Sequence, residues 1–64
     1  MKYKKFDVVK LNDNNRATIL NVEKNKYFVE IVNPYGVTLD KTFISEDKIR
    51  KTIYVSKQND LRFI

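Results

Sequence analysis

The sequence predicts a small all-β domain, in which five short strands close into a barrel and a single 3₁₀ turn precedes the last strand. The chain has 64 residues, enough for one domain with one thin core. Its apolar residues come in five short runs, rich in β-branched and aromatic side chains, and turn-forming residues separate the runs. No segment has the apolar spacing of a helix of ordinary length.

The first two strands are expected over residues 6–11 and 16–23. Residues 12–15, which lie between them, are all Asn or Asp and favour a turn because their side chains hydrogen-bond the nearby backbone. In the second run the apolar positions change phase after Ile19, which indicates a bulge or a sharp bend in that strand.

The third strand is expected over residues 27–32, where nearly every residue is β-branched or aromatic. Side chains alternate between the two faces of a strand, and the face without a charged residue should be the core. Val29 and Ile31 are therefore expected to be almost fully buried, and Glu30 is expected to be exposed.

Two tight hairpins flank the third strand. Residues 24–26 form the first loop, in which Asn25 is expected at positive φ because Asn tolerates that conformation best after Gly. Residues 33–36 have Asn, Pro and Gly at the first, second and fourth positions of a type I turn. Gly36, the only glycine, is expected at positive φ, where it closes the second hairpin.

The last two strands are expected over residues 37–44 and 50–55. Lys41 interrupts the apolar side of the fourth strand, which indicates a strand that is half exposed or bulged at that point. Ile53 and Val55 alternate in the fifth strand and are expected to face the core.

Two segments are expected outside the strands. Residues 45–49 predict a single 3₁₀ turn with Ser45 as the N-cap, since five residues are too few for a stable helix. We assign residues 1–55 to the barrel and residues 56–64 to a C-terminal tail.

This order of elements resembles that of small bacterial SH3-like domains of the KOW and Tudor type, and in particular a family of short bacterial proteins of uncharacterised function. The resemblance covers about residues 5–55, and its apolar segments are FDVVKL at 6–11, ATIL at 17–20, FVEIV at 28–32 and FISEDKI at 43–49. It implies a five-stranded SH3-like barrel. The glycine of the KOW second strand has no counterpart here, so the resemblance speaks for the fold more than for a function.

Composition excludes several kinds of chemistry. The chain has no cysteine and no histidine, so thiol catalysis, disulfides, soft-metal sites and the most common general base are absent. A single glycine leaves no glycine-rich phosphate loop. We therefore expect no catalytic residues, no cofactor and no metal, and a protein that is not an enzyme.

The sequence also has a bearing on location and origin. No apolar run approaches the length of a membrane span, and the basic N-terminus leads into no apolar signal region, so a cytoplasmic protein without a membrane partner is expected. Abundant Lys, Asn and Ile with a single Ala suit an AT-rich genome, such as that of a low-GC bacterium or its phage.

The net charge of +5 and the exposed aromatic residues indicate a binding module. One hypothesis is a protein-interaction or inhibitor module of the kind that phages and mobile elements encode, with a monomer favoured over a dimer. The alternative is a nucleic-acid-binding module that combines a basic face with aromatic side chains. The partner, protein or nucleic acid, stays open. The candidate binding surface consists of Arg16, Lys24, Lys26, Phe28, Tyr35, Lys41 and Tyr54.

Overall fold

The computed structural model describes residues 2–56, so the tail expected over residues 56–64 lies outside the described residues apart from Ser56. The elements are β1 (Val8–Leu11), β2 (Arg16–Val22), β3 (Tyr27–Val32), β4 (Thr38–Ile44), the 3₁₀ turn η1 (Glu46–Lys48) and β5 (Ile49–Tyr54). The all-β class, the five strands and the 3₁₀ turn before the last strand are confirmed.

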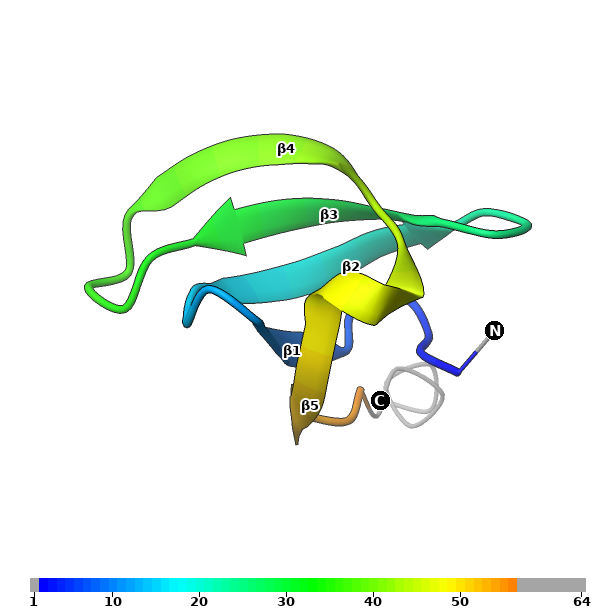
Figure 1. Ribbon diagram of the computed structural model, residues 1–64, viewed down its shortest axis with the longest axis horizontal. Coiled ribbons are helices and arrows are strands. Elements are labelled where there is room, and N and C mark those ends of the chain that lie inside the picture. Colours follow the sequence, from blue (N-terminus) through cyan, green and yellow to red (C-terminus); the bar gives the residue numbers. More distant parts are fainter. Residues whose placement is uncertain (1, 57–64) are drawn as a thin grey trace, which may run out of the picture.

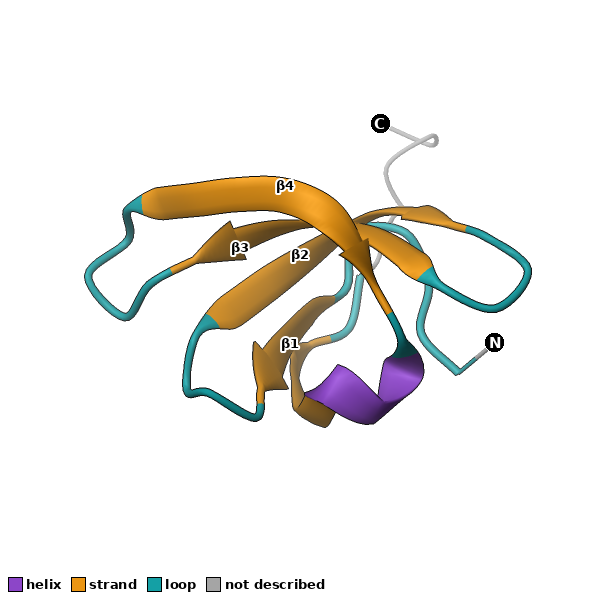
Figure 2. Ribbon diagram, turned by 45° about the horizontal axis from the view of Figure 1, so that its top comes forward, coloured by secondary structure: helices purple, strands orange, loops and turns teal. Residues whose placement is uncertain are grey.

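The strands form one antiparallel sheet in the order β4-β3-β2-β1-β5. Figures 1 and 2 show that the sheet is strongly curved, and in Figure 1 β1 and β5 lie below β2, β3 and β4. Within residues 2–56 no strand pairing joins β4 to β5, so these two strands are the edges of an open sheet. The 3₁₀ turn connects one edge strand to the other.

The core lies on the concave side of the curved sheet. The side chains of Val9, Ile19, Tyr27 and Val29 are fully buried. Their alternation along β1, β2 and β3 is what one buried sheet face requires. The core cluster as a whole comprises Tyr3, Val9, Leu11, Ala17, Ile19, Tyr27 and Val29, with Val22, Ile31, Ile44 and Ile49 packed against it.

The third strand follows the predicted range, but its burial is less complete than expected. Val29 is confirmed as a core residue, whereas Ile31 is only partly buried. Ile31 lies opposite Asp40, next to a register shift that interrupts the pairing with edge strand β4, so less of the sheet covers it. Glu30 is half-buried rather than exposed, and its carboxylate accepts a hydrogen bond of 2.7 Å from the Thr38 hydroxyl.

The expectation that Ile53 and Val55 face the core is wrong, because their side chains are 44% and 58% exposed. Two register shifts interrupt the pairing of β5 with β1, and one of them skips Ile53. A skipped residue changes which face the following side chains occupy. Ile49 instead packs against the core from this strand.

The hairpin between β3 and β4 forms as predicted. Gly36 has a φ of +87°. Its amide donates to the carbonyl of Asn33 at 3.0 Å, and the Asn33 amide donates to the carbonyl of Val37 at 2.9 Å. The two bonds close a turn that needs one residue in the left-handed region, where glycine is unstrained.

The prediction that Asn25 has a positive φ is wrong. Within residues 2–56, the non-glycine residues at positive φ are Phe6 and Asn14, and Asn25 is not among them. In the loop before β3 the Glu23 amide donates a hydrogen bond of 2.9 Å to the Lys26 carbonyl. Ser45 occupies the N-cap position of η1 as predicted, although its hydroxyl donates to the Asp47 carboxylate and makes no capping hydrogen bond to the backbone.

The bulge predicted in the second strand is confirmed by a register shift between Ile19 and Asn21 in the pairing of β2 with β3. The shift lets β2 curve around the core.

Asp7 ties together the segments that precede β1 and follow β5. Its buried carboxylate accepts hydrogen bonds from the Ser56 amide at 2.8 Å, the Lys4 amide at 3.1 Å and the Lys4 Nζ at 3.0 Å. Burial alone raises the pKa of a carboxyl, but these hydrogen bonds and the Lys4 charge outweigh it, so the pKa of Asp7 lies below its ordinary value of 3.8.

Candidate functional site

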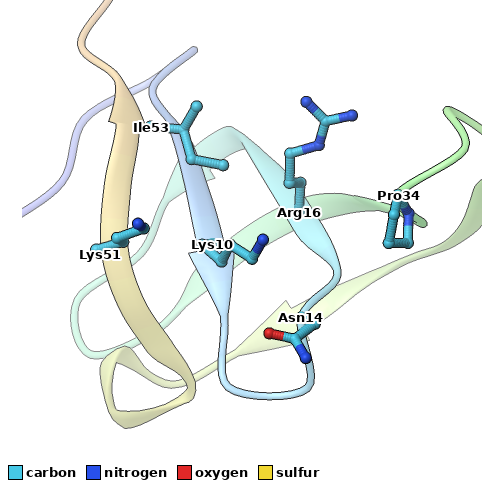
Figure 3. A pocket seen from close by; sticks show the side chains of 6 residues that line it. All are labelled: Lys10, Asn14, Arg16, Pro34, Lys51 and Ile53. Atoms are coloured by element: carbon cyan, nitrogen blue, oxygen red, sulfur yellow. The ribbon is translucent and has the colours of Figure 1, made fainter.

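A row of three cations crosses the face of the sheet that points away from the core, which we call the outer face. In the strand register Lys10 of β1 lies directly opposite Arg16 of β2 and also opposite Lys51 of β5. Residues paired across antiparallel strands project from the same face, with Cβ atoms about 4.5–5.5 Å apart. Figure 3 shows these three side chains on neighbouring strands. We call Lys51, Lys10 and Arg16 the basic row.

Within the described residues, no carboxylate lies within salt-bridge distance of the basic row. Within residues 2–56 the ion pair that forms joins Lys4 and Asp7, away from the row. Like charges directly opposite each other on neighbouring strands are destabilising. The like charges of the basic row therefore destabilise the folded state, and a bound anion would reduce their repulsion.

A groove of about 400 Å³ follows the basic row. Its lining residues, all labelled in Figure 3, are Lys10, Asn14, Arg16, Pro34, Lys51 and Ile53. Asn14 has a φ of 74°, and its side-chain oxygen accepts a hydrogen bond of 3.0 Å from Arg50, which holds it beside the groove. The register shift that turns Ile53 away from the core gives the groove an apolar wall.

A second feature of the outer face is an aromatic pair at the other end of β3. Phe28 lies opposite Phe43 of β4, with ring centroids 5.0 Å apart and planes inclined by 54°. The Lys26 Nζ lies 4.4 Å from the centre of the Phe43 ring, within the range of a cation–π contact. Phe43 is 50% exposed. We call Lys26, Phe28 and Phe43 the aromatic patch.

Between the basic row and the aromatic patch, Glu30 lies opposite Lys41. Among the acidic residues of the paired strands, Glu30 lies nearest to the region between the basic row and the aromatic patch. Its carboxylate accepts a hydrogen bond from the Thr38 hydroxyl, and Lys41 is its partner in the strand register. Both neighbours stabilise the negative charge of Glu30. Because Lys41 offsets the charge of Glu30, the positive charge of the outer face is concentrated at the basic row and at Lys26.

The structure brings five of the seven predicted surface residues to the outer face: Arg16, Lys26, Phe28, Lys41 and Tyr54. Tyr54 of β5 lies opposite Val8, two residues along β1 from Lys10. The other two, Lys24 and Tyr35, lie in the two hairpin loops. Tyr35 is 90% exposed at the tip of its turn.

Sequence reasoning missed Lys10, Lys51 and Phe43. The outward orientation of Lys10 could have been predicted, because it alternates with the apolar Val9 and Leu11. Its neighbours could not, because they depend on β1 pairing with both β2 and β5.

The described part of the chain also sets limits on other sites. Residues 2–56 hold no group of three or more acidic, cysteine or histidine side chains that could bind a metal ion. In the same range no helix has the length and apolar character needed to cross a membrane.

Comparisons of the chain with protein-family models, with curated proteins and with solved structures found no match.

Proposed function

We propose that this domain binds nucleic acid through the outer face of its sheet, and that the basic row contacts the phosphates. The observation that carries the proposal is the position of Lys10 between Arg16 and Lys51, with no salt-bridge partner among residues 2–56 and with a groove alongside. A phosphate backbone is the common ligand that presents several negative charges in a line.

The shape of the site favours a polymer over a single small anion. Strands are about 4.8 Å apart, so three residues in one row across neighbouring strands span about 10 Å. A linear array of this length faces successive phosphates, whereas a pocket for one phosphate would converge its donors on a single point. The net charge of +5 adds a long-range attraction for the same ligand.

We also interpret the fold as an SH3-like barrel that is open between β4 and β5. The strand order, the strong curvature and the 3₁₀ turn between the two edge strands support this class.

Fluorescence anisotropy with a labelled oligonucleotide, measured over a range of salt concentrations, tests the function. For three phosphate contacts on a single strand, log K should fall against log salt with a slope of about −2. The double variant Lys10→Gln/Lys51→Gln should reduce the slope to about −1.

The matched control is Lys5→Gln/Lys48→Gln, which lowers the net charge by the same amount outside the groove. It should keep the slope of the wild type. Absence of binding at low salt, or an equal loss in both double variants, contradicts a phosphate site at the basic row.

A second candidate function is protein interaction at the outer edge of β4, with which no strand pairs within residues 2–56. Large apolar side chains lie exposed on and beside this edge strand: Val37, Leu39 and Phe43 are 55%, 52% and 50% exposed. An unpaired strand edge can take an extended segment of another protein as an added strand. Leu39→Lys should abolish such a complex and leave the salt-dependent binding of an oligonucleotide intact.

A further inference from the structure

The aromatic patch and the basic row share one continuous face. Side chains two residues apart on a strand project on the same side, so Phe28, Glu30 and Val32 of β3 belong to one face. Val32 lies opposite Arg16, which places Arg16 and Phe28 on that same face. The four residue steps from Val32 to Phe28 correspond to about 13 Å along the strand.

Cations mark a path between the two features. The path begins at the basic row, passes Lys41 on β4 and ends at Lys26, beside Phe43. Small single-strand-binding domains combine a basic track for the backbone with aromatic side chains on which bases stack. The outer face has both components, with the basic row running across the strands and the aromatic patch further along β3 and β4.

Phe43 is the aromatic residue of the aromatic patch that is most open to solvent, with 50% of the residue exposed. Phe28 packs against it and fixes its position, and half of its surface stays open to solvent. The Lys26 Nζ lies 4.4 Å from the centre of the ring, and a base that stacks there would displace this flexible side chain, whose charge could then pair with the phosphate of that base. In a duplex the faces of the bases are covered by their neighbours, so a ring on a protein surface can stack only on unpaired bases.

We infer that the domain selects single-stranded over double-stranded nucleic acid, because unpaired bases stack on Phe43 while the basic row holds the phosphates. This inference rests on the proposed nucleic-acid binding and adds the kind of strand that is bound.

The test compares a mixed-sequence single strand of about 12 nucleotides, within the usual site sizes of small barrels, with the duplex of the same sequence. Anisotropy titrations use the full chain at one low salt concentration. The wild type should bind the single strand at least about fivefold more tightly than the duplex. Phe43→Leu should remove that preference and leave duplex binding and the salt slope unchanged.

Two further variants separate stacking from folding. Phe43→Tyr keeps an aromatic ring and should retain the preference for the single strand. If Phe43 had only a structural role, the Tyr and Leu variants would show the same preference whenever their melting temperatures are equal. Tyr35→Leu removes a 90% exposed ring at the opposite end of β3 and should also retain the preference.

A duplex that binds as tightly as the single strand, or a Phe43→Leu variant that loses both ligands equally, overturns the inference and leaves the phosphate site standing. Absence of binding to either ligand overturns the proposed function as well.

Discussion

Replacing Lys10 with glutamate is expected to stabilise the domain and, at the same time, to weaken its binding to nucleic acid. Lys10 lies opposite Arg16 on one side and Lys51 on the other. The substitution converts two like-charge pairs into two opposite-charge pairs. Glutamate and lysine are both poor strand formers, so intrinsic strand preference contributes little to the difference.

The size of the effect follows from the geometry of the row. A directly opposed cross-strand pair contributes about 0.2–1 kcal/mol, and pairs exposed to solvent fall in the lower part of that range. Arg16 and Lys51 are exposed and Lys10 is half-buried. Two pairs therefore give a gain of about 0.5–1.5 kcal/mol, which corresponds to a rise of about 2–12 °C in melting temperature for a domain of this size.

Thermal melting at low salt and in about 1 M salt measures the gain in stability and shows whether it is electrostatic. At the higher salt concentration charges are screened beyond about 3 Å, so the stability difference should shrink. Lys10→Gln, which removes the repulsion without adding attraction, should give roughly half the gain. In the binding assay Lys10→Glu should reduce the salt slope by about 1.

A Lys10→Glu variant that is less stable than the wild type, with a deficit that salt does not change, would refute the reasoning. It would show that Lys10 does not lie between two cations. Lys5→Glu, which changes the net charge equally outside the groove, serves as the control and should not raise the melting temperature.

Three further predictions concern the fold. Gly36→Val should lose more than about 1 kcal/mol in urea unfolding, because a β-branched residue is strained at a φ of +87°; a variant as stable as the wild type would contradict this. Ile19→Ala should cost about 2–5 kcal/mol and Ile31→Ala clearly less, since only Ile19 is fully buried; equal losses would argue against the observed burial. The pKa of Asp7 is lower in the folded state than in the unfolded chain, so its stabilisation is present above pH 3.8 and is lost as the pH falls through the folded value; Asp7→Asn should flatten that acid dependence, measured by urea unfolding at each pH.

Local patterns predicted most of the secondary structure because local physics decides it. The range of the third strand follows from its run of β-branched and aromatic residues. The turn at Gly36 follows from the residues that a type I turn and a left-handed position require. The bulge in β2 was visible as a change in apolar phase after Ile19.

Local patterns failed where the pairing of strands sets the orientation of side chains. Ile53 alternates as a core residue should, yet a register shift against β1 turns it outward into the groove. Ile31 belongs to the buried face, yet the irregular pairing with β4 leaves it partly open. Both register shifts depend on how the whole sheet curves, and that curvature cannot be predicted from a short stretch of sequence.

The features of the candidate site likewise fall into those that the sequence predicts and those that depend on the tertiary structure. The sequence by itself determined the all-β class, the excess of positive charge and the presence of aromatic residues outside the core, because composition and alternation express these directly. Only the tertiary structure decided that Lys51, Lys10 and Arg16 form one row and that Phe28 meets Phe43. These neighbours come from different strands, and the order and register of strands are fixed by burial of the common core rather than by any one segment.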